Sequence, residues 1–314
     1  MNIHIVLFYK FQKIEDPQYF AKKHLQFCKK LGVFGKVLVA HEGINGSISG
    51  TQEQIETYKK YVHSLKGFED VWFKEEQGAS HPFTKMFVRI KKEIIRIDTD
   101  VDMNKKGEYI SPQELKKLYD SKEDFIIVDA RNYYESHVGK FKNALTPELK
   151  TFREFPQFVN KFKKEIQDTN KKIVTYCTGG IRCEKASAYL KQEGFTNVYQ
   201  LEGGIINFCQ QIPDNKEWEG KCFVFDKRLM SDIDQNKKPI TTCESCHTIC
   251  DLYKNCKNPS CDKLSIICVP CQDKLQGCCS HKCCKEFNVY ARERARLKKE
   301  GKWLPTIKIQ NYVK

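Results

Sequence analysis

The chain has 314 residues, enough for two or three domains with separate hydrophobic cores. Its 54 Lys and Arg outnumber 40 Asp and Glu, and the net charge of +14 favours a polyanionic partner, although a lysine-rich surface can also serve solubility alone. No run of about 18 apolar residues is present, and the first strand-like segment lacks the features of a signal peptide. We therefore expect a cytoplasmic protein without a transmembrane helix.

Residues 1–97 are predicted to form a ferredoxin-like βαββαβ domain of the acylphosphatase-like type. A strand-like segment, HIVLFYKF, precedes a helix that begins at the cap signal Asp16-Pro, and a second helix begins at Thr51. Between these helices, VFGKVLVAHEGINGSISG predicts two short strands. His41 and Glu42 in this segment suit either a ligand- or RNA-contacting loop or, the favoured interpretation, a tight hairpin that needs Gly and Asn.

The rest of the chain divides by composition into four segments. Residues 98–109 are polar and are predicted to be a linker, and residues 110–214 alternate helices with the β-rich runs FIIVDAR, KIVTYCT and TNVYQLEGG. Such alternation indicates a parallel α/β sheet. Residues 215–289 are rich in cysteine, and residues 290–314 form a basic tail. The predicted class is therefore a multidomain protein with one α+β domain, one α/β domain and a small Cys-rich segment.

The candidate catalytic residue is Cys177, which follows a strand at the edge where ligands bind in open α/β sheets. The TGGIR turn and the helix that follows it direct N–H groups toward the sulfur and favour a thiolate. Arg182 can hold an anionic substrate or adduct. The loop is one residue shorter than the Cys-x5-Arg loop of cysteine phosphatases, so it suits a smaller group such as a terminal sulfur. The residues expected to contact substrate are Thr178, Gly179, Gly180 and Ile181.

The motifs VDARNYYESHVGKFKNA, YCTGGIRCEKA and VYQLEGGI resemble those of a rhodanese domain, in which the loop cysteine carries a persulfide. The resemblance gives that role to Cys177. Asp129 and Arg131 are expected to brace the fold as an ion pair, and Glu135 to act similarly. Cys183 is a candidate for resolving a Cys177 adduct as a disulfide, or it is only a small residue packed at the start of a helix.

Eleven cysteines lie between Cys243 and Cys284, including two Cys-x2-Cys knuckles. Because sixteen cysteines in a reducing compartment favour metal binding or catalysis over disulfides, we expect structural Zn(II). An iron–sulfur cluster, disulfides and free thiols are the alternatives. The sequence does not decide which cysteines share a metal. The candidate ligands are Cys243, Cys246, Cys250, Cys256, Cys261, Cys268, Cys271 and Cys278.

Three segments together, VAHEGINGSISG, CTGGIRCEKAS and the Cys-rich run from CESC to CCSHKC, resemble the oxygen-dependent tRNA uridine 5-hydroxylases over nearly the whole chain. The resemblance implies the wobble uridine in a tRNA anticodon loop as substrate, molecular oxygen as co-substrate and 5-hydroxyuridine as product. The sequence shows neither a Gly-x-Gly-x-x-Gly motif for a flavin or nicotinamide nor a two-His-one-carboxylate iron site. The basic tail, with Trp303 and Tyr312, suits RNA binding or a solvated helix. The sequence does not indicate the oligomeric state.

One mechanism needs no further cofactor. The Cys177 thiolate adds to C6 of uracil, C5 becomes electron-rich enough to react with oxygen, and the thiolate then departs. Arg182 and the loop amides would hold the developing enolate or a phosphate. The alternative function is a thiosulfate-type sulfurtransferase that passes a Cys177 persulfide to a small thiol or a protein. A non-catalytic adaptor is disfavoured because the loop keeps its thiol and its arginine.

Overall fold

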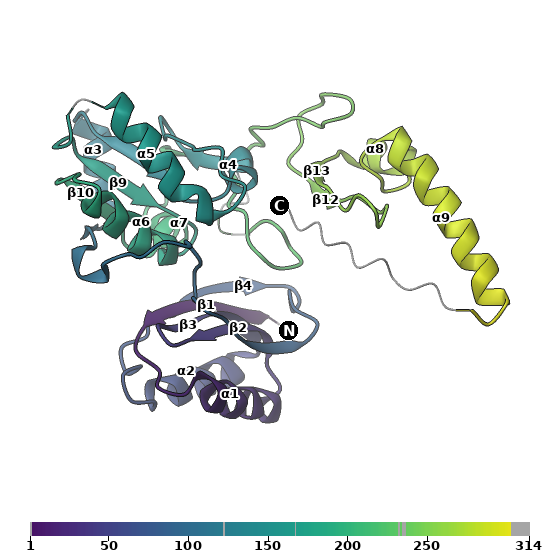
Figure 1. Ribbon diagram of the computed structural model, residues 1–314, viewed down its shortest axis with the longest axis horizontal. Helices are drawn as coiled ribbons and strands as arrows, with labels where there is room; N and C mark the ends of the chain where they lie inside the picture. The colour runs from purple at the N-terminus through teal and green to yellow at the C-terminus, as the bar shows by residue number, and fades with distance from the viewer. Residues whose placement is uncertain (1, 122, 167, 232, 234–236, 303–314) are drawn as a thin grey trace. The chain divides into compact units, whose positions relative to one another are not determined.

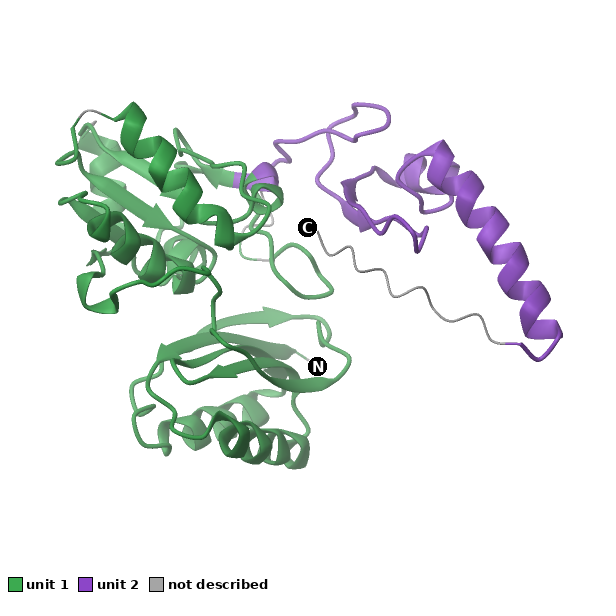
Figure 2. Cartoon of the chain, in the orientation of Figure 1, with its two compact units in different colours: residues 1–136, 140–236 green, residues 137–139, 237–314 purple. Residues whose placement is uncertain are grey.

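The computed structural model describes residues 2–121, 123–166, 168–231, 233 and 237–302 (Figure 1). The chain divides into two compact units, which are coloured separately in Figure 2. The first contains residues 1–136 and 140–236, and the second contains residues 137–139 and 237–314. None of the helices in the described part of the chain combines the length and the apolar character needed to cross a membrane.

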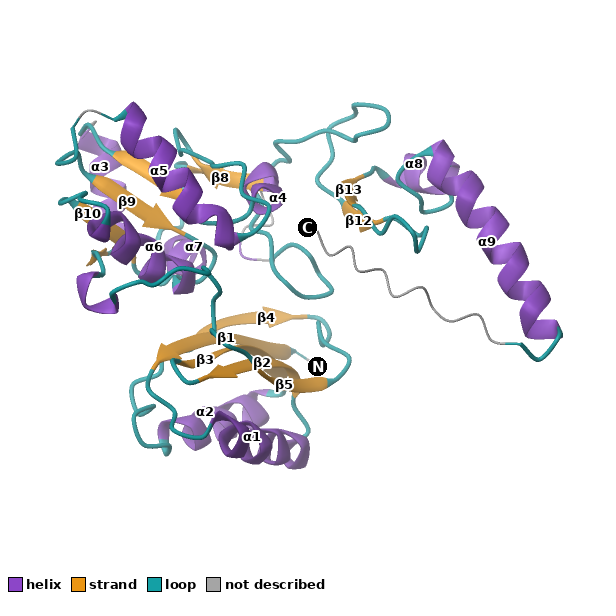
Figure 3. Ribbon diagram, in the orientation of Figure 1, coloured by secondary structure: helices purple, strands orange, loops and turns teal. Residues whose placement is uncertain are grey.

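The N-terminal domain is a single sheet with two helices packed on one face (Figure 3). Its strand order is β4-β1-β3-β2-β5, in which β4-β1-β3-β2 is the ferredoxin-like arrangement that the sequence predicts and β5 is an added edge strand parallel to β2. The other neighbouring strands are antiparallel. The elements are β1 (Ile3–Phe11), α1 (Pro17–Leu31), β2 (Phe34–Ala40), β3 (Gly43–Gly50), α2 (Gln52–His63), β4 (Lys74–Gly78) and β5 (Met86–Ile90).

Helix caps explain where the two helices of this domain begin, and the alternation along its strands explains which face of the sheet the helices cover. Asp16 accepts hydrogen bonds from the first turn of α1, and Thr51 forms a capping box with Gln54 at the start of α2. Along β1, Val6 and Phe8 point into the core beneath the helices. The residues that alternate with them belong to the opposite face of the sheet, because strand side chains have a period of two. That opposite face forms part of the site described below.

The second domain of the first unit has a parallel sheet in the order β6-β10-β9-β7, as the helix–strand alternation predicts. Separate apolar clusters pack on its two faces, as expected for a sheet covered by helices on both sides. Its elements, with two short 3₁₀ helices named η1 and η2, are η1 (Met103–Lys105), β6 (Glu108–Ile110), α3 (Pro112–Ser121), β7 (Ile126–Asp129), α4 (Tyr133–Val138), β8 (Gly139–Phe141), η2 (Phe152–Glu154), α5 (Phe155–Glu165), β9 (Ile173–Tyr176), α6 (Ile181–Gln192), β10 (Val198–Leu201), α7 (Gly204–Gln211) and β11 (Trp218–Gly220).

The segment predicted as a linker, residues 98–109, packs against this domain. The Gly107 N–H donates to Ser187 Oγ on α6, and Gln200 Nε2 donates to the Gly107 carbonyl. A Cβ on Gly107 would lie 2.6 Å from the Val198 carbonyl oxygen, so only glycine permits this approach. The polar composition of the segment therefore reflects its surface position and does not mark a free tether.

The second unit contains a small antiparallel sheet and two helices. Its elements are β12 (Tyr253–Asn255), β13 (Leu264–Ile266), α8 (Val269–Lys274) and α9 (His281–Lys299). No residue of α9 is buried, so the described part of the basic tail, through Lys302, begins as a solvated helix. Trp303 and Tyr312, which the sequence analysis singled out in this tail, lie outside the described residues.

Candidate functional site

The loop after β9 presents Cys177 at the start of α6, where the sequence predicts it. The Gly180 N–H donates to Cys177 Sγ at 3.1 Å, and Gly180 has a φ of 101°, which favours glycine. The neighbouring α7 holds the loop backbone, because the Ile205 N–H donates to the Cys177 carbonyl at 3.0 Å. A Cβ on Gly204 would lie 2.3 Å from this carbonyl oxygen. The Gly–Gly motif after β10 therefore lets α7 approach the reactive loop.

The electrostatics of the loop favour the Cys177 thiolate. Burial by itself raises the pKa of this thiol, but a hydrogen bond from Cys183, the charge of Arg182 and backbone N–H groups outweigh it and lower the pKa to about 6. Cys183 behaves in the opposite way, because burial and the neighbouring Cys177 charge raise its pKa well above the usual value. The pair therefore holds one thiolate and one thiol at neutral pH.

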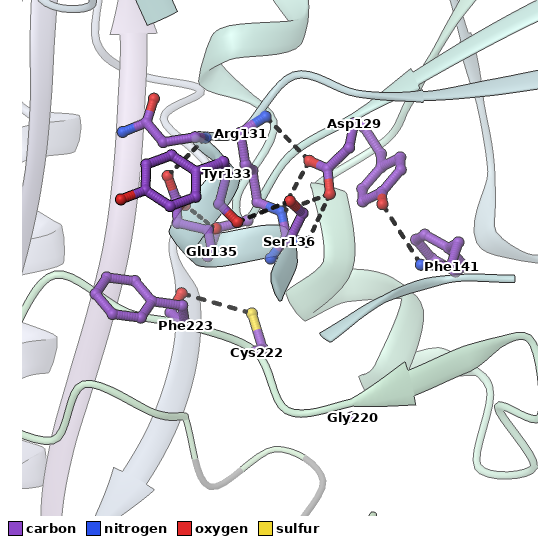
Figure 4. Close-up of polar contacts among 12 residues, drawn as sticks. Asp129, Arg131, Tyr133, Glu135, Ser136, Phe141, Gly220, Cys222 and Phe223 are labelled. Atoms are coloured by element: carbon purple, nitrogen blue, oxygen red, sulfur yellow. Dashed lines mark hydrogen bonds and ion pairs between the residues drawn. The ribbon is translucent and has the colours of Figure 1, made fainter. Parts of the chain in front are cut away.

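Arg182 is already paired within the protein. Its two terminal nitrogens donate to the two carboxylate oxygens of Glu135 at 2.6 and 2.7 Å, and both side chains are buried. Asp129 and Arg131 form a second buried ion pair with an N–O distance of 2.7 Å, as predicted (Figure 4). Both arginines brace the loop and the sheet edge, and Glu135 occupies the hydrogen-bonding edge of Arg182 that an anionic substrate would need.

The N-terminal domain supplies the facing wall of the site. A Cβ on Gly179 would lie 2.5 Å from Leu7 Cδ2, and one on Gly180 would lie 3.0 Å from the Tyr9 hydroxyl oxygen. The Tyr9 hydroxyl donates to Glu184 of α6 at 2.9 Å. The paired glycines of the loop thus serve a second purpose, since they let β1 approach the Cys177 loop closely.

Ion pairs reinforce the same contact. Lys185 Nζ on α6 lies 2.9 Å from a carboxylate oxygen of Glu42 and 2.7 Å from one of Glu93, and it also donates to the Ile95 carbonyl. Glu42 follows β2 in the tight β2–β3 turn, where Gly43 begins β3 with a φ of 144°. The favoured interpretation of this segment as a hairpin is confirmed, and its acidic residue binds the neighbouring domain.

A cavity of about 760 Å³ lies between these walls, a volume typical of small-molecule sites. Of the predicted site residues, Cys177, Thr178, Gly179, Ile181 and Arg182 line it. Gly180 and Cys183 do not, although Gly180 contacts the Cys177 sulfur directly and Cys183 hydrogen-bonds to it. Five exposed basic side chains also line the cavity: Lys36, Lys91, Lys92, Arg96 and Arg153.

Lys74, at the start of β4, is a site residue that the sequence analysis missed. It lines the cavity with Cys177, and its side chain is buried. Its Nζ lies 4.3 Å from the centroid of the Trp72 ring and 5.1 Å from that of Tyr9. In the sequence it is one lysine among many, in the segment DVWFKEE. Only the folding of this strand against the second domain distinguishes it.

Eight cysteines of the second unit form two groups of four. One contains Cys243, Cys246, Cys268 and Cys271, and the other contains Cys256, Cys261, Cys279 and Cys283. Within each group the four sulfurs lie within 4.8 Å of one another. Of the predicted ligands, Cys250 and Cys278 belong to neither group, whereas Cys279 and Cys283 join the second. The spacing did not reveal this because the second group takes single cysteines from separate turns and one from α9.

The donor sets fit a single tetrahedral metal ion in each group. The Sγ–Sγ distances are 3.5 Å for Cys246–Cys268, 3.7 Å for Cys261–Cys279 and 3.6 Å for Cys279–Cys283. Four sulfurs at about 2.3 Å from one zinc ion lie about 3.8 Å apart. None of the described cysteines forms a disulfide. These cysteine groups can therefore each hold a metal.

Family models match three parts of the chain. Residues 3–94 match the UPF0176 acylphosphatase-like domain, residues 111–211 the rhodanese-like domain and residues 219–284 the rhodanese C-terminal model. The chain is 42% identical over 297 residues to the tRNA uridine(34) hydroxylase of Staphylococcus epidermidis, covering 92% of both chains. The chain belongs to the tRNA uridine(34) hydroxylase family. The family member from Acholeplasma laidlawii is 41% identical over 288 residues, covering 90% of this chain and 89% of that one.

The family assignment agrees with the resemblance found in the sequence, and the tRNA uridine(34) hydroxylase relatives span both units of this chain. A crystal structure of a rhodanese-like domain protein from Staphylococcus aureus is 27% identical, covers 32% of this chain and 90% of that one, and has a TM-score of 0.28. Because this TM-score is low, the assignment rests on the relatives and the family models.

Proposed function

We propose that the protein hydroxylates C5 of the wobble uridine of tRNA, with molecular oxygen as co-substrate, in an oxidoreductase reaction that depends on Cys177. The observation that carries the proposal is a thiol with its pKa lowered to about 6 in the wall of a cavity of about 760 Å³. Family membership gives the substrate class. Because tRNA is the proposed substrate, we also propose that the protein acts in the cytoplasm.

The distribution of charge supports an RNA substrate. The five exposed cations of the cavity, Lys36, Lys91, Lys92, Arg96 and Arg153, are suited to phosphate contacts. A wobble base is already unstacked in an anticodon loop, so it can enter a pocket at modest cost. We propose that the phosphate backbone of the anticodon loop binds these cations while the wobble base reaches Cys177.

The first chemical step is addition of the Cys177 sulfur to C6 of uracil. The sulfur electron pair forms the S–C6 bond, and the C5–C6 π pair moves toward C5 and the C4 carbonyl. Oxygen then reacts at C5 to give a hydroperoxide. Loss of the C5 proton and departure of the sulfur from C6 restore the C5–C6 double bond of the uracil ring. The low pKa of Cys177 serves both stages, because a stable thiolate is available for attack and leaves readily.

Reduction of the hydroperoxide to a hydroxyl group requires two electrons, and we propose that the pair of Cys177 and Cys183 supplies them. The Cys177 thiolate, released from C6, takes the distal oxygen as a sulfenic acid, which then condenses with the Cys183 thiol to a disulfide and water. An external dithiol restores both cysteines. The overall balance is uridine, oxygen and two thiols giving 5-hydroxyuridine, water and one disulfide. Cys183 is suited to resolving the sulfenic acid because it lies in hydrogen-bonding reach of Cys177.

The test is mass spectrometry of nucleosides from hypomodified tRNA incubated with the full chain, a dithiol and oxygen-18 gas. We expect 5-hydroxyuridine carrying the heavy isotope from the wild-type protein and none from Cys177→Ser. Cys284→Ser is the matched control, because Cys284 lies outside the loop and outside both four-cysteine groups. Unchanged tRNA, together with a persulfide on Cys177 after incubation with thiosulfate, would instead support the sulfurtransferase.

For the Cys-rich unit we propose structural zinc in both groups. Four thiolates in tetrahedral reach suit zinc, and a multi-iron cluster would hold its cysteine sulfurs further apart because iron and sulfide lie between them. The test is metal analysis of the purified full chain. Two zinc ions per chain are expected, and a single ion or an iron–sulfur absorption band would contradict the assignment.

A further inference from the structure

Lys74 is a buried cation beside the reactive thiol. Its side chain is 4% exposed, and its Nζ lies against the rings of Trp72 and Tyr9. Among the residues that the structure describes, none accepts a hydrogen bond from this amine or forms an ion pair with it. A buried ammonium without such a partner is costly, so its presence in a cavity wall indicates a group that meets charge on a ligand.

The buried Arg182 and the partly buried Arg228, which also line the cavity, are neutralised by the protein. Arg182 pairs with Glu135, and Arg228 pairs with Asp226 at 2.7 Å and with Glu76 at 2.8 Å. Glu184 and Glu202 act on Lys74 electrostatically without forming an ion pair with it. Arg182 was the residue predicted to hold an anion, but Glu135 already occupies it. Lys74 is therefore the buried cation of the described cavity wall that can offer its charge to a substrate.

We propose that Lys74 is a catalytic residue that contacts the C4 carbonyl oxygen of the bound uracil and stabilises the negative charge that forms there when Cys177 adds to C6. The inference rests on the proposed function. In the step, the sulfur electron pair forms the S–C6 bond, a new π bond joins C5 and C4, and the C4–O π pair moves onto oxygen. No proton is gained or lost, and one negative charge passes from sulfur to the carbonyl oxygen.

The placement of Lys74 favours the base over the phosphate as its partner. The base must lie beside the sulfur for S–C6 bonding, and Lys74 feels the charge of that same sulfur from within the cavity wall. The phosphates are served by the exposed lysines and arginines of the cavity. Because the Trp72 and Tyr9 rings hold the ammonium in the cavity wall, it can meet the charge that develops on the carbonyl oxygen with little rearrangement, as preorganised oxyanion sites do.

The protonation state of Lys74 agrees with this role. Burial lowers its pKa to about 8, although the charges of Cys177, Glu184 and Glu202 oppose the shift. The amine is thus largely charged at neutral pH and loses its charge as the pH rises through 8. The titratable groups facing it are Tyr9 from β1, Cys177 from the loop, Glu184 from α6 and Glu202 after β10. Burial raises the pKa of Tyr9 well above its usual value, so Tyr9 does not titrate in this range.

The experiment compares Lys74→Met with Lys66→Met in the full chain. Lys66 is an exposed lysine of the same domain that does not line the cavity. With tRNA in single turnover, we expect Lys74→Met to lower the rate of 5-hydroxyuridine formation about 100-fold, as loss of one oxyanion contact does elsewhere. Lys66→Met should match the wild type. Binding of tRNA should stay within about twofold for both variants, because the phosphate contacts remain.

A second readout isolates the addition step from oxygen. Anaerobic incubation of the proteins with tRNA that carries 5-fluorouridine at the wobble position should yield a covalent Cys177 adduct on a denaturing gel. Lys74→Met should slow its formation by a similar factor. If the wild type forms neither adduct nor 5-hydroxyuridine, the proposed function itself fails. If the wild type forms both and Lys74→Met forms them within about threefold of its rates, the role of Lys74 is overturned.

Two further measurements separate catalysis from an effect on the thiol or on folding. The pH profile of Cys177 alkylation by iodoacetamide should shift upward in Lys74→Met, because the ammonium favours the thiolate, but the rate above pH 8 should stay near that of the wild type. A loss of alkylation at that pH that matched the loss of activity would overturn the proposal. Lys74→Arg keeps a cation in the wall and guards against a misfolded Met variant. The activity of Lys74→Arg should persist above pH 8, where the activity of the wild type falls. If the activity of Lys74→Arg fell over the same pH range, deprotonation of Lys74 would not be the cause of the fall in the wild type.

Discussion

The two units use cysteine in opposite ways. In the first, Cys177 has one sulfur neighbour, Cys183, and is surrounded by N–H groups and the charge of Arg182. In the second, each grouped cysteine has three other sulfurs within 4.8 Å. A thiolate stabilised by N–H donors remains a free nucleophile, whereas four thiolates in contact require a cation to offset their mutual repulsion. The neighbours of a cysteine, and not the cysteine itself, decide between reaction and metal binding.

Metal removal should have the largest effect, and it should be confined to the second unit. Substitution Cys271→Ser removes one ligand of the first group, and a structural zinc ion contributes on the order of 10 kcal/mol to the folding of such a segment. We expect loss of one metal per chain and rapid hydrogen exchange around β12 and β13, with normal alkylation of Cys177. Equal loss of exchange protection around β9 would contradict the separation of the two kinds of cysteine site.

Breaking the ion pair behind the reactive loop should destabilise the first unit. Substitution Glu135→Ala leaves the buried Arg182 charge without its partner, at a cost of about 3–5 kcal/mol in the free energy of unfolding. Urea denaturation measures this cost, with Glu148→Ala as the exposed control expected to stay within about 0.5 kcal/mol. Similar midpoints for the two variants would show that the pair does not brace the loop.

The pH dependence of thiol reactivity should distinguish the two kinds of cysteine directly. Cys177 is a thiolate above its pKa of about 6, so its alkylation should rise as the pH increases through 6 and level off above 7. The cysteines of the two groups should stay unmodified at pH 7 until a chelator removes their metal. Mass spectrometry of alkylated peptides measures both, and a difference of about 100-fold in rate is expected. Rapid modification of Cys271 in the untreated protein would argue against metal binding.

The smallest predicted effect concerns the hydrogen bond between the two loop cysteines. Cys183→Ala removes the donor that lowers the pKa of Cys177, so alkylation at pH 6 should slow several-fold. Cys183→Ser keeps a donor and should preserve the rate of alkylation. Both variants should lose multiple turnovers of hydroxylation if Cys183 resolves the Cys177 sulfenic acid. A full turnover rate in Cys183→Ser would assign the reduction to another thiol.

The local features of this protein could be read from short stretches of sequence. The cap at Asp16, the capping box at Thr51 and the Cys177 loop depend on residues that are close together in the chain, and the structure places each as predicted. The pairing of Arg182 with Glu135 was harder to foresee, because 47 positions separate the two residues. Sequence reasoning gave Arg182 a substrate-binding role that its buried partner already fills.

The two groups of four cysteines show the same limit. The Cys-x2-Cys knuckles identified the four members of the first group because both sulfurs of a knuckle come from one turn. In the second group, the sequence does not distinguish Cys279 from its neighbour Cys278. Adjacent residues point in different directions, and only the fold decides which of the two faces the other sulfurs.

By itself, the sequence determined the succession of domains, the cysteine with its glycine-rich loop, and the presence of a Cys-rich segment that could hold a metal, because each depends on local spacing or composition. Only the tertiary structure decided which side chains complete the site. Lys74 and Tyr9 reach the cavity from strands more than 100 positions away, and their burial, ring contacts and charge environment exist only once β1 and β4 lie side by side at the cavity that Cys177 lines. Desolvation and charge pairing are properties of three-dimensional neighbours, so the chemistry of a buried lysine cannot be read from its position in the chain.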